Sequence, residues 1–417
     1  MFTVYLFDRE VGTLERARRG IRFTYTSEAV QDDAMPALST SLPKRAESFT
    51  NRHAGPYFQN LLPEQSYRRL VGGATPLDPS DSLGLLGAIG GECPGAVSIW
   101  PEGHNPPERH DYELLTDSAL EALFSMREPG RFGAAVARGR LSLPGVQEKI
   151  ALLRERTGEW KLPLNGAVTS HILKRPAMEF PGLLANELFC MTLARASGLN
   201  VSAVAIAAPG IDVLSVERFD RVASGATQSR PRLRVHQEDF CQALGVEPER
   251  KYQRDGGPGL SQCAAFVRNN SSLPARDIPA LVGWVGFNYL IGNEDAHAKN
   301  LAFLFTDDGL RLSPHYDLVC TTVYPNLERS MAMKLGSAWD IREVQRADWK
   351  TFANQTRQSW DLVRSDLLNL ADSVAAALTE THGQCSRMLQ DDETYSRVGD
   401  GILERIERLR RELTHTT

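Results

Sequence analysis

Three side chains suited to phosphoryl transfer lie close together in the stretch IGNEDAHAKNLAFLFTDDGLRLSPHYDL, residues 291–318. Asp295 and Asn300 are separated by four residues and precede a short apolar run, and Asp317 follows a second short run. This Asp-x-x-x-x-Asn spacing is that of a kinase catalytic loop, in which the Asp receives or orients the hydroxyl proton and the Asn holds Mg²⁺. A later Asp that also holds Mg²⁺ completes such a set. The pattern predicts Asp295 as the catalytic residue and Asn300 and Asp317 as metal ligands.

The sequence between these residues predicts a β-hairpin that brings its two ends together. Asp308 and Gly309 are a strong signal for a two-residue turn. With that turn, Asn300 would face Asp317 on the neighbouring strand, where opposed Cα atoms lie about 4.5–5.5 Å apart. At that distance both side chains can supply the hard oxygen ligands that Mg²⁺ prefers.

Two other interpretations of this stretch stay open. Asp295 and Asn300 can simply cap a turn, with Asp317 at a polar strand end. Alternatively, His297, His315 and Asp317 can form the two-histidine, one-carboxylate site of a metal-dependent hydrolase, since His315 and Asp317 would share a strand face. The hydrolase interpretation predicts Zn²⁺ or Fe²⁺ in the purified protein and gives Asp295 and Asn300 no role.

A kinase also needs a cation upstream that holds the nucleotide phosphates, and Lys174 is the candidate. It ends a β-like run in SHILKRP, as the phosphate-binding lysine of kinases does. The next segment, GLLANELFCMTLARASG, predicts a helix with Glu187 inside its apolar stripe and Gly198 as its stop. A carboxylate placed toward a core is costly without a partner, so Glu187 either pairs with Lys174 or lies at the wet edge of the stripe.

The turn LSLPGVQEK, residues 141–149, lies where a phosphate-covering loop would be expected. It contains one glycine and one proline and so departs from the Gly-x-Gly-x-x-Gly pattern. Spacing alone therefore indicates an ordinary turn.

The elements that must position these residues divide into three expected domains. Residues 1–105 should form a β-rich N-terminal subdomain that ends near a proline-rich linker, residues 101–113. Residues 106–235 should form a small lobe with Lys174, and residues 236–417 a mainly helical large lobe with the catalytic loop. The local patterns predict short strands at Phe2–Phe7, Ile21–Tyr25, Lys149–Arg154, Glu159–Leu164 and Thr169–Lys174. They predict helices at Pro56–Val71 and Asp117–Ser125.

Composition limits the class of protein. A chain of 417 residues with 42% hydrophobic and 24% charged residues is typical of a globular protein with two or three domains. The formal net charge of -5 argues against a protein that coats nucleic acid through bulk charge. The six cysteines are scattered without a Cys-x-x-Cys pair, which suits a reducing cytoplasm. Because no long apolar run and no leader pattern is present, we expect a cytoplasmic protein with no membrane partner.

Together these residues resemble the HipA toxin kinases of bacterial toxin–antitoxin modules. The matching stretches follow the family order from about residue 140 to 320 and are SLPGVQEKIALL, HILKRP, NELFCMTLARASGLNV, SVERFDR, QEDFCQALGV, KYQRDGGPG, GNEDAHAKN and PHYDL. The first hundred residues are similar to the small β-rich domain of the full-length family members.

The resemblance implies ATP and Mg as cofactors, Asp295 as the catalytic base, and Asn300 and Asp317 as the magnesium ligands. The stretch Glu217–Phe219 resembles the hinge that receives adenine. The implied ATP-binding residues are Pro144, Gly145, Val146, Gln147, Glu148, Lys149, Lys174, Glu217, Arg218, Phe219, His297, Ala298, Lys299, Asn300, Tyr316 and Asp317.

Ser142 lies at the position of a serine that is autophosphorylated in the resembling family. A phosphate there would add about -1.5 to -2 charge, and Arg138 and Arg140 are local cations that could hold it. Such a change could withdraw the loop from the nucleotide and silence the kinase. The alternative is a plain turn serine that caps its own backbone.

The resemblance further implies an α+β fold: a kinase-like two-lobed fold with a mixed small lobe, a mainly helical large lobe and a β-rich N-terminal subdomain. ATP is expected between the lobes, near Glu217–Phe219. Family members phosphorylate serine or threonine on a protein, in known cases an aminoacyl-tRNA synthetase, and are held by a DNA-binding antitoxin. Because the net charge of the chain is negative, we expect it to contact operator DNA only within the antitoxin complex. The alternative function is a nucleotide-binding pseudokinase that docks an antitoxin–operator complex.

Overall fold

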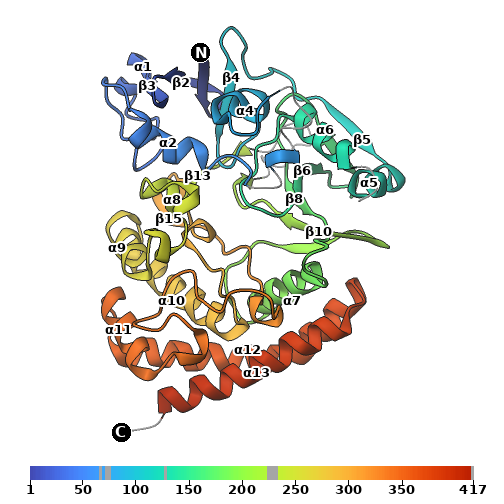
Figure 1. Cartoon of the computed structure of the whole chain (residues 1–417), viewed down its shortest axis with the longest axis vertical. Helices are drawn as coiled ribbons and strands as arrows, with labels where there is room; N and C mark the ends of the chain where they lie inside the picture. Colours follow the sequence, from blue (N-terminus) through green and yellow to red (C-terminus); the bar gives the residue numbers. More distant parts are fainter. Residues whose placement is uncertain (65–67, 71–76, 126–128, 223–232, 415–417) are drawn as a thin grey trace. The chain divides into compact units, whose positions relative to one another are not determined.

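A computed structural model describes residues 1–64, 68–70, 77–125, 129–222 and 233–414 (Figure 1). The chain divides into two compact units. The first unit consists of Met1–Arg175, Ser215–Pro248 and Leu304–Thr306, and the second of Pro176–Leu214, Glu249–Phe303 and Asp307–Thr417. The three domain ranges expected from the sequence stay predictions.

The described residues form both strands and helices, as expected for an α+β fold. The strands are β1 (Phe2–Leu6), β2 (Arg9–Ala17), β3 (Gly20–Tyr25), β4 (Val97–Pro101), β5 (Tyr112–Leu115), β6 (Lys149–Arg154), β7 (Trp160–Pro163), β8 (His171–Lys174), β9 (Val204–Ala208), β10 (Ile211–Glu217), β11 (Arg221–Val222), β12 (Leu233–Arg234), β13 (His236–Asp239), β14 (Ala302–Thr306) and β15 (Gly309–Leu312). The α-helices are α1 (Ser27–Gln31), α2 (Asn51–Gln59), α4 (Ser82–Ile89), α5 (Asp117–Phe124), α6 (Pro129–Gly139), α7 (Leu183–Ala196), α8 (Phe240–Ala243), α9 (Leu260–Asn270), α10 (Pro274–Ile291), α11 (Arg346–Thr356), α12 (Trp360–Met388) and α13 (Asp392–Thr414).

The N-terminal residues of the first unit form an antiparallel sheet in the order β3-β2-β1-β4. Ile21, Phe23 and Tyr25 of β3 alternate with more exposed residues, so one face of this strand is buried. The strand predictions for the first 25 residues are confirmed, although β2 between them was not predicted. The helix predicted at 56–71 begins earlier, since α2 covers Asn51–Gln59, and residues 65–67 and 71 lie outside the described residues.

A second sheet has the order β5-β7-β6-β8-β10-β9, and β6 pairs antiparallel with both β7 and β8. These three strands confirm the three short runs predicted around Lys174. The small third sheet has the order β13-β14-β15. The division into units passes through β10 and through β14.

Helices dominate the second unit, in agreement with the predicted helical C-terminal half. The helix α7 is the predicted one, and its chain leaves the helix just before Gly198. The long helices α12 and α13 pack against each other and against α7 and α10 (Figure 1). Trp284, Trp349 and Tyr395 are fully buried among them and fill the core of this unit. None of the described helices is long and apolar enough to cross a membrane.

Candidate active site

The loop that carries Asp295 begins where α10 ends at Gly292. Its first residues are tied to the chain that follows Asp317: the Gly292 carbonyl oxygen accepts from the Thr321 amide at 3.0 Å, and the Glu294 amide donates to Thr321 Oγ1 at 2.7 Å. The Asp295 amide donates to the side chain of the preceding Asn293 at 3.0 Å. The backbone on both sides of the candidate site is therefore fixed by hydrogen bonds within the second unit.

The predicted hairpin exists, but the prediction of its turn at Asp308-Gly309 is wrong by one residue. Asp307 and Asp308 lie between β14 and β15, and Gly309 is the first residue of β15. Gly309 has a φ of +99°, so glycine serves the strained position just after the turn. The strand ladder also stops short of Asn300, which ends a 3₁₀ turn over Ala298–Asn300.

Asn300 and Asp317 nevertheless meet. The Asn300 Nδ2 atom donates a hydrogen bond to Asp317 Oδ2 at 2.9 Å, and Asp317 adopts a left-handed backbone with a φ of +58°. The His297 amide donates to Asn300 Oδ1 at 3.2 Å, and the Tyr316 hydroxyl donates to the Lys299 carbonyl oxygen at 2.7 Å. The 2.9 Å contact joins the amide nitrogen of Asn300 to Asp317, and the amide oxygen of Asn300 and the carboxylate of Asp317 are hard oxygen atoms of the kind that Mg²⁺ prefers.

Asp295 is exposed and has a partner that the sequence did not reveal. The Tyr252 hydroxyl donates to Asp295 Oδ1 at 2.8 Å, and the Tyr252 ring lies edge-on to the His297 ring at 5.6 Å between centroids. Tyr252 belongs to KYQRDGGPG, a stretch that resembles the HipA family but for which the sequence predicts no specific role. A tyrosine in a glycine-rich loop 43 residues upstream of Asp295 gives no local signal for such a contact.

His297 is a neutral imidazole at pH 7. Burial disfavours its charged form and lowers its pKa to about 4. Two carboxylates and two ammonium groups act on it in opposite directions, since Asp295 and Asp317 raise the pKa and Lys251 and Lys299 lower it. The site therefore combines both signs of charge around a buried neutral ring.

The two-histidine, one-carboxylate interpretation is wrong. The described residues contain no group of three or more His, Cys, Asp and Glu side chains that could hold a metal ion. The His315 imidazole instead hydrogen-bonds the backbone of Ala280 in α10, and burial lowers its pKa to about 4. His315 is thus a buried structural residue of the second unit.

Within the first unit, Lys149 and Lys174 are direct partners across the antiparallel pair β6 and β8. Lys174 ends β8 and is only 6% exposed. Like charges directly opposite each other in a sheet repel. Two lysines that are opposite each other at one strand end are candidates to bind phosphate oxygens.

The turn before β6 is more constrained than its spacing indicated. Gly145 has a φ of +105°, and a Cβ atom there would lie 2.6 Å from Lys149 Nζ. A side chain at this position would be strained and would displace the lysine. The Gln147 side chain donates to the Arg175 carbonyl oxygen at 3.2 Å, and Glu148 forms an ion pair with the Arg175 guanidinium. The turn is thus attached to the residue that follows Lys174.

Ser142 is fully buried, whereas Pro144 is half-buried and Val146 is exposed. The Ser142 hydroxyl donates to the Leu61 carbonyl oxygen at 2.7 Å. In this conformation the hydroxyl is inaccessible, so its modification would require the turn to move.

The two cations predicted to hold a phosphate on Ser142 have other partners. Arg138 forms an exposed ion pair with Glu113 at 2.6 Å. Arg140 donates to the carbonyl oxygens of Gly87 and Ile99 at 2.8 and 3.1 Å. A phosphate on Ser142 would have to compete with these contacts.

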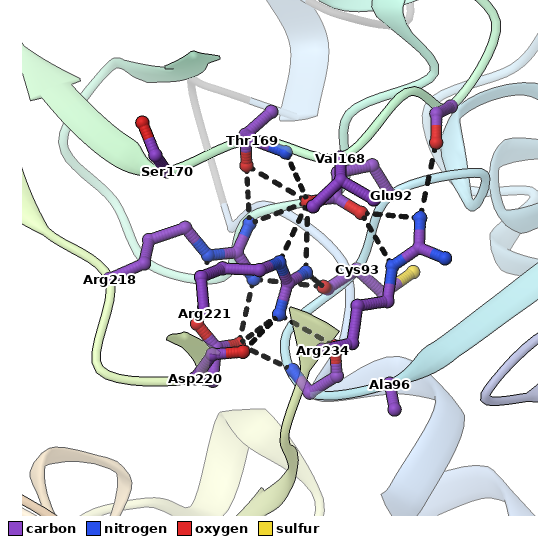
Figure 2. A network of polar contacts seen from close by, with 12 residues as sticks. Glu92, Cys93, Ala96, Val168, Thr169, Ser170, Arg218, Asp220, Arg221 and Arg234 are labelled. Atoms are coloured by element: carbon purple, nitrogen blue, oxygen red, sulfur yellow. Dashed lines mark hydrogen bonds and ion pairs between the residues drawn. The ribbon is translucent and has the colours of Figure 1, made fainter. Parts of the chain in front are cut away.

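The candidate hinge Glu217–Phe219 connects β10 to β11. Glu217 and Phe219 are half-buried, but the Arg218 side chain is 4% exposed and points into the protein, as Figure 2 shows. The Arg218 amide donates to the Ser170 carbonyl oxygen at 3.0 Å. Any nucleotide contact of Arg218 would therefore use its backbone, not its guanidinium.

Glu187 is 1% exposed in α7 of the second unit, which excludes the wet edge of the helix. Lys174 belongs to the first unit. The Lys174–Glu187 ion pair stays a prediction.

Comparison with known proteins identifies the family. The HipA-like C-terminal domain matches residues 141–382, which is more than half of the chain, and the HipA N-terminal domain matches residues 2–100. The chain belongs to the HipA family. The serine/threonine-protein kinase toxin HipA of Shewanella oneidensis is 30% identical over 360 residues, which cover 82% of this chain and 80% of that protein. Y4mE of Sinorhizobium fredii, which is named a candidate kinase, is 38% identical over 421 residues and 98% of each chain.

A solved structure of HipA-family architecture agrees with the fold. In the complex of Shewanella oneidensis MR-1 HipA with HipB and its operator DNA, the matched chain has a TM-score of 0.83 and 25% identity, covering 99% of this chain and 97% of that one. The fold of this HipA-family chain is therefore kinase-like, and kinase activity is supported at the level of the family.

One further residue near the site of this HipA-family chain, Arg405, lies beyond residues 141–382, which match the HipA-like C-terminal domain. Arg405 of α13 donates through Nε to the carbonyl oxygen of Leu290, near the end of α10, at 2.8 Å. Its Nη1 atom lies 3.4 Å from Thr322 Oγ1, in the segment that follows Asp317. Arg405 thus joins the chain before the loop of Asp295 to the chain after Asp317. Helix periodicity at the C-terminus could not reveal this contact.

Proposed function

We propose that this chain is an ATP- and Mg²⁺-dependent serine/threonine protein kinase that acts as the toxin of a toxin–antitoxin module. The observation that carries the proposal is the 2.9 Å contact between Asn300 and Asp317 within one unit that also presents the exposed Asp295. Phosphoryl transfer needs mainly positioning and charge neutralisation, and these residue types supply both.

In the proposed reaction, the γ-phosphoryl group of ATP passes to a serine or threonine hydroxyl oxygen, the bond to the β,γ-bridging oxygen breaks, and ADP leaves. Asp295 receives the hydroxyl proton, and the hydrogen bond from Tyr252 fixes the orientation of its carboxylate. Bound Mg²⁺, held by Asn300 and Asp317, would neutralise the charge of the phosphates.

The proposed nucleotide residues of the first unit act by charge and by backbone. Lys149 and Lys174 would contact the phosphates, which is supported by their direct pairing across β6 and β8. The turn around Gly145 would cover the phosphates, and the backbone of Glu217–Phe219 would receive adenine.

Two finer proposals concern partners. By family, the protein substrate is an aminoacyl-tRNA synthetase. The Shewanella oneidensis HipA structure contains HipB and operator DNA, which supports a cognate DNA-binding antitoxin for this chain. The net charge of -5 supports operator contact only through that antitoxin.

Autophosphorylation is proposed at Ser142. Because its hydroxyl is buried against Leu61, a phosphate would force the turn out of its present position. The kinase would then lose the loop that covers ATP.

The test compares wild type with Asp295→Ala and Asp317→Ala after brief expression, by quantitative phosphoproteomics and by thermal unfolding of the purified proteins. One dominant phosphosite should appear with wild type only, while both variants stay folded. ATP with Mg²⁺ should raise the unfolding temperature of wild type by mass action. Folded variants that phosphorylate as well as wild type would show that the roles are misassigned. Stabilisation by ATP without any turnover in wild type would favour the pseudokinase.

A further inference from the structure

A buried carboxylate, Glu92, lies at the centre of a network of charged groups in the first unit (Figure 2). It lies between α4 and β4, within the residues that match the HipA N-terminal domain. Its Oε1 atom accepts from the amide and hydroxyl of Thr169 at 3.1 and 2.9 Å, from Arg218 Nη1 at 3.2 Å and from Arg221 Nη2 at 2.9 Å. Its Oε2 atom accepts from Arg234 Nη2 at 2.9 Å.

A second carboxylate completes the network. Asp220 accepts from Arg218 Nε at 2.9 Å and Nη2 at 2.8 Å, and its Oδ2 atom accepts from the amide of Gly95 at 2.7 Å. Burial alone would raise the pKa of Glu92, but the three neighbouring arginines lower it to about 2. Glu92 is therefore ionised at every physiological pH.

The backbone of Glu92 holds a different part of the proposed nucleotide site. Its amide donates to the Arg140 carbonyl oxygen at 2.9 Å, and its carbonyl oxygen accepts from the Ser142 amide at 3.0 Å. The chain that enters the phosphate-covering turn is thus attached to Glu92. One N-terminal residue contacts the turn through its backbone and the hinge through its side chain.

We propose that Glu92 is a positioning residue for ATP, which couples the N-terminal domain to nucleotide binding by fixing Arg218 in the hinge and the entry to the turn at Ser142. This inference rests on the proposed function, because the nucleotide roles of the hinge and the turn belong to it. Arg218 emerges from the middle of the hinge, so the direction of its side chain determines the backbone conformation of Glu217–Phe219. Without the Glu92 charge, the three buried guanidinium groups would be neutralised by fewer carboxylates, and the hinge would relax away from its present conformation.

Glu238 offers a matched control. It is also a buried carboxylate that links N-terminal residues to the segment 215–248, since it accepts from Ser39 Oγ at 2.5 Å and from the Thr40 amide at 3.1 Å. Within the described part of the chain, its hydrogen bonds do not involve the hinge or the turn. Removal of its charge therefore changes a comparable link without touching the proposed nucleotide site.

The experiment measures the dissociation constant of ATP in the presence of Mg²⁺ by titration calorimetry at pH 7.5. Urea unfolding at the same temperature checks that each protein is folded before ATP is added. Glu92→Gln should raise this constant at least tenfold, whereas Glu238→Gln should stay within about twofold of wild type. Equal affinity of folded Glu92→Gln and wild type would overturn the inference and leave the proposed function standing. A wild-type protein that binds no ATP would instead reject the proposed function.

Two further variants separate positioning from charge balance and from failure to fold. In Glu92→Gln with Arg221→Gln, one negative and one positive group are removed together, and ATP affinity should stay weak because Arg218 still lacks its ion pair with Glu92. Recovery of wild-type affinity would show that charge balance alone matters and would overturn the inference. If Glu92 variants do not fold, Thr169→Val removes only the neutral hydroxyl that bridges Glu92 and Arg218. It should raise the dissociation constant about threefold, and an unchanged value would contradict the proposal.

Discussion

The Tyr252 hydroxyl donates a 2.8 Å hydrogen bond to the carboxylate of Asp295. The donor comes from the segment between β13 and α9, and the acceptor from the loop after α10. A carboxylate that must receive a proton is more effective when its orientation is fixed before the substrate arrives. Tyr252 is therefore a positioning residue for the proposed catalytic base.

Tyr252→Phe should lower kcat by roughly 10- to 100-fold, since a hydrogen bond to a charged group contributes about 1.5–3 kcal/mol. The ring contact with His297 is retained, and affinity for ATP with Mg²⁺ should stay within about twofold. Steady-state kinetics with the protein substrate found by phosphoproteomics measures kcat and the dependence of the rate on ATP concentration. Tyr289→Phe is the control, because the buried Tyr289 hydroxyl has no hydrogen-bond partner among the described residues. An unchanged kcat in Tyr252→Phe would remove the positioning role.

Incubation with ATP and Mg²⁺ should add one phosphate at Ser142 and weaken ATP binding at least tenfold. The reason is steric and electrostatic: a group of about -1.5 to -2 charge does not fit where the hydroxyl now contacts Leu61. Mass spectrometry locates the phosphate, and limited proteolysis should show new cleavage within residues 141–149. Ser142→Ala should remain unmodified at this position and resist the cleavage. Phosphorylated protein that binds ATP as tightly as unmodified protein would exclude self-silencing.

Arg405→Ala should destabilise the protein by about 1–3 kcal/mol and lower kcat severalfold, because the end of α10 loses its link to α13 beside the proposed catalytic loop. Urea unfolding and steady-state kinetics provide the two measurements. Arg410→Ala on the same helix is the control: its ion pair with Asp372 is exposed, and such pairs contribute about 0–1 kcal/mol. Equal effects of the two changes would mean that the Arg405 contacts have no special importance.

The stability of the first unit should depend on the titration of Glu238. Burial raises its pKa to about 7 in the folded protein, above the ordinary value of 4.5 for a glutamate side chain. Between pH 4.5 and 7 the folded state therefore binds the proton more tightly than the unfolded state, so this group's stabilising contribution is present at low pH and is lost as the pH rises to 7. Relative to Glu238→Gln, wild type should lose on the order of 1–3 kcal/mol of unfolding free energy from pH 4.5 to 7.5.

Buried His236 titrates in an overlapping range with the opposite sign, since burial lowers its pKa to about 4. It is present in both proteins, so its contribution cancels in the difference between them. Urea unfolding at several pH values supplies that difference. A difference that does not change with pH would contradict the raised pKa of Glu238.

Much of the local structure could be predicted because it depends on residues close together in the sequence. The strand β6 has the predicted bounds Lys149–Arg154, and α7 ends just before the predicted stop at Gly198. Side-chain periodicity and turn residues report these features directly. The spacing of Asp295 and Asn300 is likewise a property of the sequence alone, so their roles in phosphoryl transfer could be predicted without knowledge of the fold.

What only the tertiary structure decided is which polar groups meet. The hairpin turn lies one residue earlier than predicted, and the Asn300–Asp317 contact arises from a 3₁₀ turn and a left-handed Asp317, neither of which a strand pattern indicates. Tyr252 reaches Asp295 across 43 residues, and Glu92 reaches Arg218 across 126. Periodicity identifies a buried face but cannot identify the partner of a buried charge, because that partner is determined by the packing of distant segments.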